Sequence, residues 1–153
     1  MVKFQFSSFI NAPVAAVWAF HERPDAIQLL TPPETPLVVE SRTGSLEVGS
    51  RIVFRVSHLK IRWVAEHTEY AYQKLFADRQ VEGPFRTWQH RHLFAAEGHG
   101  TRLTDEIEFS LPLSPLSDWL AGWAVKLQLK SMFRYRHAIT KIECEAKRDP
   151  IAR

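Results

Sequence analysis

The chain has 153 residues, of which 45% are hydrophobic and 24% charged, as in a single soluble globular domain. This composition excludes collagen-like, coiled-coil, low-complexity and disulfide-rich proteins. The single cysteine, Cys144, allows neither an intramolecular disulfide nor a cysteine zinc site, and the first residues lack the apolar run of a signal peptide. We therefore expect one domain over residues 1–153 in a reducing, cytoplasmic compartment.

Basic charge is concentrated at the C-terminal end. Residues 126–153 contain eight Lys/Arg and three Asp/Glu, whereas the first 125 residues contain twelve Lys/Arg and fourteen Asp/Glu. The simplest interpretation is a solvated helix face, and the alternative is contact with an anionic membrane surface or an acidic partner. Because no nucleic-acid-binding motif accompanies the charge, we expect no nucleic-acid partner.

A strand and two short helices are predicted first. Apolar and polar side chains alternate from Val2 to Ile10, which is typical of a half-buried strand. Asn11-Ala12-Pro13 ends this strand and opens a short helix, because proline is well tolerated in a first helical turn. Pro24 ends that helix, and a second short helix follows to about Leu30.

Hydrophobicity then alternates with period two as far as Leu111, interrupted by short turn signals. Such short links between consecutive strands indicate an antiparallel meander. The predicted strands cover residues 37–42, 50–58, 60–69, 72–81, 85–96 and 101–111.

A long helix completes the chain. No proline occurs between Pro115 and Pro150, which allows a helix of roughly 30 residues. We expect one stripe of this helix to face the sheet, and several apolar residues off the stripe hint at a homodimer contact. The stripe contains Leu116, Leu120, Trp123, Ala124, Leu127, Ser131, Tyr135, Ala138 and Ile142; the residues off it include Trp119, Val125 and Leu129.

The predicted fold is therefore α+β, with a curved antiparallel sheet of about seven strands wrapped around the long C-terminal helix. In this arrangement the apolar face of the sheet and the apolar stripe of the helix are buried against each other.

The last two strands place polar residues on their apolar faces. In strand 85–96 the even positions Trp88 and Phe94 indicate the inward face, which also carries His90 and His92. The inward face of strand 101–111 contains Leu103, Asp105, Ile107 and Phe109. A two-residue Gly98-His99 turn pairs His92 with Asp105 and aligns the two apolar faces.

The register of strand 72–81 is open between two alternatives. One places Asp78 opposite His90, with Phe76 and Gln80 on the same inward face. A slip of one residue would instead turn Leu75, Ala77 and Val81 inward. The apolar pattern alone slightly favours the slip, whereas the similarity of the F-x-D-x-Q spacing to that of the family named below favours the first register, which we adopt.

Three interpretations of this polar cluster stay open. It could be a satisfied hydrogen-bond network, a set of groups that orients a ligand, or an acid–base or metal site. For a metal, His90 and His92 would need a further ligand, and only Asp78 or Asp105 is offered. Our prediction is that no metal and no cofactor are bound.

The order of elements is that of the helix-grip fold, and the sequence resembles the SRPBCC superfamily along essentially its whole length. That superfamily includes START domains, birch-pollen-allergen-like proteins and polyketide cyclase/dehydrase-type proteins. The stretch F-x-D-x-Q-x-x-G-P-F-x-x-W-x-H-x-H-x-F at residues 76–94 is similar to that of a bacterial branch. The resemblance implies a hydrophobic cavity but no single chemistry.

We therefore expect a carrier or sensor that binds a hydrophobic or lipid-like small molecule in an internal cavity. The alternatives are a cyclase- or dehydratase-type enzyme with His92 and Asp105 as its acid–base pair, and a protein that docks on a membrane or partner through its basic C-terminal helix. The expected ligand-binding residues are Trp63, Asp78, Gln80, Trp88, His90, His92, Phe94, Asp105, Phe109, Trp123, Leu127 and Tyr135.

Overall fold

The computed structural model describes residues 1–145. The helices and strands that the sequence predicts are all present. Residues 146–153 lie outside the described range, and with them three of the eight basic residues noted near the C-terminus. The elements are β1 (Val2–Ile10), α1 (Val14–Glu22), α2 (Ala26–Leu29), β2 (Leu37–Thr43), β3 (Arg51–Val56), β4 (Ile61–Ala71), β5 (Leu75–Glu82), β6 (Thr87–Glu97), β7 (Gly100–Ser110) and α3 (Leu116–Glu145).

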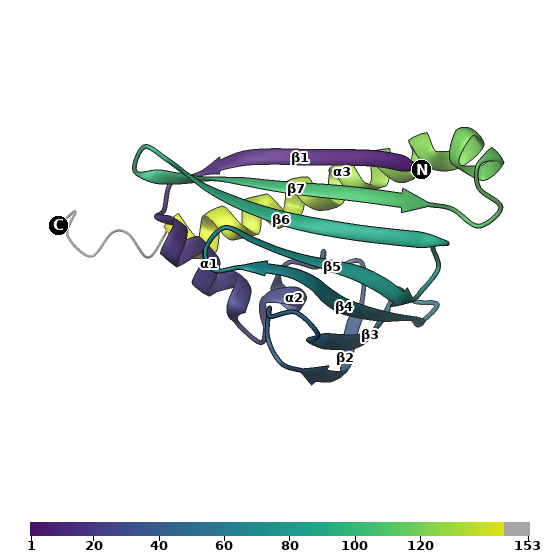
Figure 1. Cartoon of the computed structure of the whole chain (residues 1–153), viewed down its shortest axis with the longest axis horizontal. Coiled ribbons are helices and arrows are strands. Elements are labelled where there is room, and N and C mark those ends of the chain that lie inside the picture. Colours follow the sequence, from purple (N-terminus) through teal and green to yellow (C-terminus); the bar gives the residue numbers. More distant parts are fainter. Residues whose placement is uncertain (146–153) are drawn as a thin grey trace.

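The seven strands form one antiparallel sheet in the order β1-β7-β6-β5-β4-β3-β2. Figure 1 shows the long helix α3 running along β1, and α1 packs against α3 and against β6 and β7. Consecutive strands from β2 to β7 are neighbours, and β1 returns to pair with β7. This is the helix-grip α+β architecture that the sequence predicts.

Both predicted strand registers are confirmed. His92 pairs with Asp105 between β6 and β7, and Asp78 pairs with His90 between β5 and β6. The one-residue slip of β5 is therefore excluded. Because side chains alternate across a strand, these pairings place Asp78, His90, His92 and Asp105 on the face of the sheet that looks toward the helices.

The predicted facing of α3 is wrong. Leu129 and Phe133 are buried against the sheet, whereas Trp123 and Leu127 of the expected inner stripe are exposed by 63% and 60%. The buried face carries the polar residues His137 and Thr140, and the partners of His137, Ser8 and Asp105, lie on the sheet; hydrophobicity alone therefore selected the opposite face. The buried residues of α3 are Gly122, Leu129, Phe133, His137, Thr140 and Cys144.

Two apolar cores lie between the sheet and the helices. The α1 core surrounds Trp18, whose ring makes edge contacts with Phe76 and Phe94. The α3 core packs Phe133 against Phe4, together with Trp88, Ile107, Phe109 and Leu129. Buried polar residues occupy the space between these two cores and form the candidate site.

Candidate functional site

The buried carboxylate of Asp105 is the centre of the site. It accepts hydrogen bonds from Nε2 of His90 at 2.7 Å and Nε2 of His137 at 2.6 Å, and it forms an ion pair with Nδ1 of His92 at 2.8 Å. Two of these donors come from the neighbouring strand β6 and the third comes from α3. The predicted His92–Asp105 pair is therefore present, and one carboxylate connects the sheet to the long helix.

His137 extends this network to the edge of the sheet. Its Nε2–H is donated to Asp105, so the other ring nitrogen, Nδ1, is available to accept the hydroxyl hydrogen of Ser8 on β1. Ser8 thus has a histidine partner, which the sequence did not reveal. Ser8 does not line the small cavity described below, and we interpret the contact as a hydrogen bond that holds β1 to α3.

His92 lies between two carboxylates. Its Nδ1 contacts Asp105, and its Nε2 lies 3.6 Å from Oδ2 of Asp78. Its ring is held between Phe76 and His90, with centroid distances of 4.1 Å and 3.8 Å. Both ring nitrogens therefore face acidic groups, an arrangement that stabilises the doubly protonated imidazolium.

The charges in this network shift each other's ionisation. Burial alone would raise the pKa of Asp105, but the attraction of His92 and the hydrogen bonds from the three histidines hold it well below its usual range. Burial alone would lower the pKa of His92, but Asp105 and then Asp78 outweigh it and raise that pKa. Together these shifts favour an ionised Asp105 beside a protonated His92.

The neighbouring histidines shift in the other direction. Burial, and then the repulsion of His92, lower the pKa of His90, although Asp105 opposes this effect. Burial lowers the pKa of His21 to about 4 against the opposing hydrogen bond to the Val17 carbonyl. These two lowered pKa values favour neutral rings at pH 7, so of His21, His90 and His92 it is His92 whose protonated form is favoured.

Asp78, His90 and His92 each bring one potential metal-ligating atom within 4.8 Å of the others. A metal requires unprotonated ring nitrogens, whereas both nitrogens of His92 face carboxylates and its pKa is raised. The donor set therefore fits a hydrogen-bond network better than a metal centre.

A small internal cavity opens beside this network. Its volume is about 10 Å³, which is about the space of one water molecule. Six of its nine lining residues are polar or charged, and the three apolar ones come from both cores and from the end of α2. It is lined by His21, Leu30, His92, Leu103, Asp105, Phe133, Arg136, His137 and Thr140.

Arg136 is the cationic side chain of this wall. Its Nε donates to the carbonyl of Leu30 at 3.2 Å, and its guanidinium lies over the Phe133 ring at 5.4 Å. Burial lowers the pKa of Arg136, while the attraction of Asp105 and Asp78 opposes this shift. Within residues 1–145 no carboxylate forms an ion pair with this guanidinium, so it can still accept an anion.

The other predicted ligand-binding residues lie in different surroundings. Trp88, Phe94 and Phe109 are buried in the two cores, and Trp63 packs against Trp88 at the margin of the α3 core. None of these four lines the small cavity.

Gln80 has a local role. Its amide donates to the Phe85 carbonyl at 2.8 Å and accepts the Phe85 N–H at 3.2 Å, which closes the turn between β5 and β6. A side chain on Gly83 would collide with this amide, because a Cβ there would lie 2.3 Å from Oε1 of Gln80. The Gln–Gly-Pro-Phe part of the motif therefore builds a turn.

Three predicted helix residues do not line the cavity. Trp123 and Leu127 point away from the sheet, and Tyr135 is half-buried outside the cavity wall. The sequence instead missed His21, Arg136 and His137. The spacing of Leu129, Phe133, Arg136, His137 and Thr140 is itself helical, and it would have indicated the buried face if polar residues had been admitted to the stripe.

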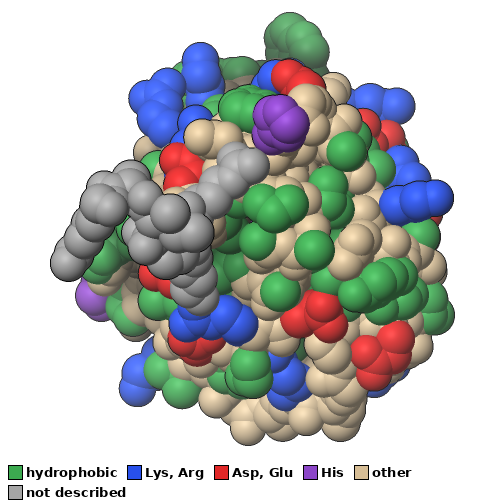
Figure 2. Space-filling view, turned by 90° about the vertical axis from the view of Figure 1, so that its left-hand side faces the viewer, with side chains coloured by type: hydrophobic (Ala, Val, Ile, Leu, Met, Phe, Trp, Pro, Cys, Tyr) green, Lys and Arg blue, Asp and Glu red, His purple; other side chains and the backbone are tan. Residues whose placement is uncertain are grey.

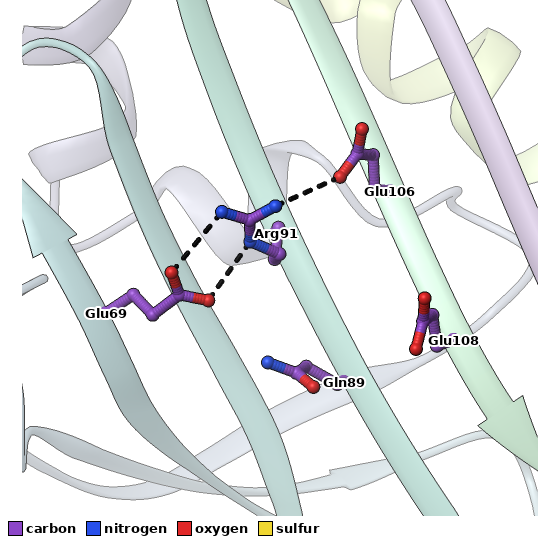
Figure 3. Close-up of a pocket in the computed structure, with 5 residues that line it drawn as sticks. All are labelled: Glu69, Gln89, Arg91, Glu106 and Glu108. Atoms are coloured by element: carbon purple, nitrogen blue, oxygen red, sulfur yellow. Dashed lines mark hydrogen bonds and ion pairs between the residues drawn. The ribbon is translucent and has the colours of Figure 1, made fainter.

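A larger hollow of about 220 Å³ lies on the opposite, outer face of the sheet. Figure 3 shows Arg91 at its centre, held by both oxygens of Glu69 and by Glu106. Its other lining residues are Gln89 and Glu108. Because its wall is charged and its cation is already paired, this hollow does not suit an apolar ligand.

Comparison with known protein families identifies the family of this chain. Residues 10–133 match the model of a family described as polyketide cyclase/dehydrase and lipid transport. The chain belongs to this family. The match confirms the resemblance to the SRPBCC superfamily that residues 76–94 indicated. A comparison with curated protein sequences gives no match.

Solved structures share the family's fold. A protein of Thermus thermophilus is 21% identical, with a TM-score of 0.72 over 95% of this chain and 99% of that chain. A point mutant of norcoclaurine synthase from Thalictrum, in complex with a transition-state analogue, is 13% identical, with a TM-score of 0.72 over 95% and 96% of the two chains. These two likenesses show the fold alone.

A third solved structure is a nucleoside-diphosphate sugar epimerase from Corynebacterium glutamicum. It is 28% identical, with a TM-score of 0.69, and the match covers 90% of this chain but only 28% of the epimerase. The helix-grip architecture is thus similar to a segment of a much longer protein.

The first prediction concerns Asp105. Asp105→Asn is expected to lower the free energy of unfolding by about 3 kcal/mol, because an amide cannot accept from three ring N–H groups and the charge opposite His92 is lost. Urea unfolding at pH 7 measures the change. The control Glu108→Gln, on the same strand and paired with exposed Lys3, should change stability by less than about 1 kcal/mol. Equal effects of the two substitutions would contradict the central role of Asp105.

The second prediction concerns pH. The pKa of His21 is about 4 in the folded protein and 6.5 in the unfolded chain, so the unfolded chain binds the extra proton below pH 6.5. His21 therefore makes stability fall as pH drops from about 6.5 to about 4, by up to about 3 kcal/mol. Urea unfolding across this range should give a shallower pH dependence for His21→Asn than for the natural protein. His58→Asn, at an exposed turn, should leave the slope unchanged, and an unchanged slope in His21→Asn would refute the assignment.

Proposed function

We propose that the protein binds an amphipathic small molecule whose acidic head group is recognised by Arg136. The observation that carries the proposal is this guanidinium, which lines an internal cavity without a carboxylate partner in the described chain. Family membership supports ligand binding as the general role. The chemistry of the cavity wall supports an anionic head group.

The head group would replace a weak internal contact. Arg136 donates to the Leu30 carbonyl at 3.2 Å, and a carboxylate accepts from a guanidinium more strongly than a neutral carbonyl does. His92 lies in the same wall, but Asp105 and Asp78 already compensate its charge, so Arg136 would carry the recognition of the head group. A neutral head group would lack this advantage, because it would exchange one ordinary hydrogen bond for another.

Binding also requires the cavity to widen. A space of about 10 Å³ holds one water molecule, whereas a ligand pocket commonly exceeds about 300 Å³. The element next to the cavity is α2, which has only four residues and continues into a segment with prolines at positions 32, 33 and 36. Since Leu30 follows α2 directly, breaking the Arg136–Leu30 hydrogen bond would free this segment to move.

In this arrangement the acid would do two things at once. It would bind the guanidinium, and by taking the place of the Leu30 carbonyl it would release α2 and expose the apolar wall formed by Leu103 and Phe133. The apolar part of the ligand would then fill the space between α2 and the sheet. Arg136 would thereby couple recognition of the acidic head group to the opening of the cavity for the apolar part of the ligand.

The third prediction tests this recognition. Decanoic acid should raise the melting temperature of the protein and bind measurably by calorimetry, whereas decanol and methyl decanoate should bind at least about 30-fold more weakly. Arg136→Gln should reduce the affinity for decanoic acid by a similar factor, because the acid loses its charged partner.

The matched control is Arg134→Gln, which removes the same charge from an exposed position two residues away. It should leave affinity unchanged. Equal affinity for acid and alcohol would overturn the assignment of the head group. Failure of aliphatic and aromatic acids alike to bind, such as decanoic and naphthoic acid, would overturn the proposed function.

A second candidate, acid–base catalysis, is favoured by one observation. His21 and His92 line the same cavity with ring centroids 6.2 Å apart, and their pKa values are shifted in opposite directions. Such a pair supplies a neutral base and a protonated acid at one pH, with Asp105 orienting the acid. This arrangement would suit proton transfer in a cyclisation, dehydration or isomerisation.

The fourth prediction distinguishes catalysis from binding. If the site is catalytic, a bound β-hydroxy or β-keto acid should exchange its α-hydrogens for deuterium in D₂O or lose one water, as followed by mass spectrometry. His92→Gln should then slow the reaction by at least about 100-fold, while acid affinity changes by less than about tenfold. His58→Gln is the control. Unchanged chemistry in His92→Gln, or loss of binding alone, would refute the catalytic role.

A further inference from the structure

The first half of α3 and Leu113, in the segment just before it, carry a ridge of exposed apolar side chains. Figure 1 shows the opening turns of this helix extending past the N-terminal end of β1. We call these six side chains the apolar ridge, and each is between 56% and 88% exposed. The ridge consists of Leu113, Leu116, Trp119, Leu120, Trp123 and Leu127. Isolated apolar side chains are common on protein surfaces, but six that lie close together along one helix are not.

The same face of the helix becomes basic in its second half. With 3.6 residues per turn, Leu116, Trp123 and Leu127 lie within about 80° of Lys130 and Arg134 around the helix axis. Lys130 and Arg134 are exposed, as is the adjacent Lys126. One continuous face of α3 is therefore apolar along its first half and cationic along its second.

This face has no acidic residue before the last turn of the helix, where the carboxylate of Glu145 accepts a hydrogen bond from the Asn11 N–H. Between Trp119 and Ile142 the helix contains no Asp or Glu. The nearest acid, Asp118, is occupied: its carboxylate accepts from the Leu111 N–H and the Ser114 hydroxyl and forms an ion pair with the N-terminal amine. The positive charge of the face is thus uncompensated by the helix itself.

The opposite end of the molecule has a different surface. Figure 2 views the end that contains α1 and the last turns of α3, and there hydrophobic side chains are interspersed with both basic and acidic ones. The combination of contiguous apolar groups with charge of one sign is therefore a feature of the α3 face.

We propose that this α3 face docks on an anionic lipid surface. Leucine and tryptophan side chains at helical spacing enter the boundary between head groups and acyl chains, where tryptophan is favoured. Lys126, Lys130 and Arg134 attract anionic head groups in the same plane. The same face of a second copy could cover the apolar ridge. It would, however, place basic residues near Lys130 and Arg134 and provide no acidic residue to pair with them.

Docking would be peripheral. Within residues 1–145 no helix is long and apolar enough to cross a bilayer. The inner face of α3 is also already occupied, because Leu129, Phe133 and His137 pack against the sheet. The proposal is independent of the ligand proposed above, since the ridge and the cavity wall share no residue.

The fifth prediction tests docking with the full chain and two vesicle compositions. The protein should co-sediment with phosphatidylcholine vesicles that contain phosphatidylglycerol and much less with phosphatidylcholine alone. Binding should weaken as salt rises, and tryptophan emission should shift to the blue when Trp119 and Trp123 leave water.

Two pairs of substitutions separate the charged and apolar contributions. Lys130→Glu with Arg134→Glu should weaken binding by at least about 25-fold, because each basic side chain near an anionic surface contributes about fivefold. Trp119→Ser with Trp123→Ser should abolish the blue shift and reduce binding. All four positions are exposed, and circular dichroism should show unchanged folding.

Matched controls lie elsewhere on the surface. Lys60→Glu with Lys74→Glu changes the net charge of the protein by the same amount as the α3 charge reversals. Val48→Ser with Leu59→Ser removes exposed apolar side chains at positions outside α3. Neither pair should alter binding. The proposal is overturned by absence of vesicle binding, by equal binding to both vesicle types, or by insensitivity to the α3 substitutions. A concentration-dependent dimer that Trp119→Ser with Trp123→Ser dissociates, without vesicle binding, would assign the ridge to a second copy instead.

Discussion

A buried carboxylate is costly unless each of its oxygens is hydrogen-bonded and its charge is compensated. Asp105 meets this requirement with donors from three histidines, and the rest of the interior depends on that arrangement. Two donors come from β6 and one from α3, so the position and rotation of the helix are restricted as soon as the carboxylate is buried. Apolar packing alone would leave more freedom, because leucine and phenylalanine contacts are not directional.

This constraint explains the mixed character of the interior. The two apolar cores are separated by a layer of polar groups, and the small cavity lies where that layer meets α1 and α2. In the layer, the ionised Asp105 favours the protonated form of His92, while burial keeps His90 and His21 neutral. Arg136 lies at the edge of the layer, where within residues 1–145 it donates a hydrogen bond to the Leu30 carbonyl and forms no ion pair, so we expect a ligand to contact the network at this side chain.

The same constraint determines which face of α3 meets water. The helix presents His137 and Thr140 to the interior, because His137 must reach Asp105, and a strongly apolar stripe is left outside. An apolar surface on the outer side of a helix is unfavourable in water unless something covers it. The basic residues that continue along this face fit an anionic lipid surface, which would bring the protein close to a source of amphipathic molecules.

The sequence by itself determined the strands, the long helix and the pairing of His92 with Asp105, which follow from period-two patterns and a short turn acting over neighbouring residues. It left the pairing of Asp78 with His90 open, because the apolar pattern of that strand also allows the register slipped by one residue. The sequence did not determine which face of α3 is buried. Both faces of the helix contain apolar residues, and a criterion based on hydrophobicity prefers the face with leucines to the face with His137. Only the tertiary structure decided this, by bringing His137 within hydrogen-bond distance of a carboxylate 32 residues away, and with it the placement of Arg136 and His21 around the cavity. Local patterns specify elements and registers, whereas the partner of a buried polar group is a long-range property that a single helix cannot encode.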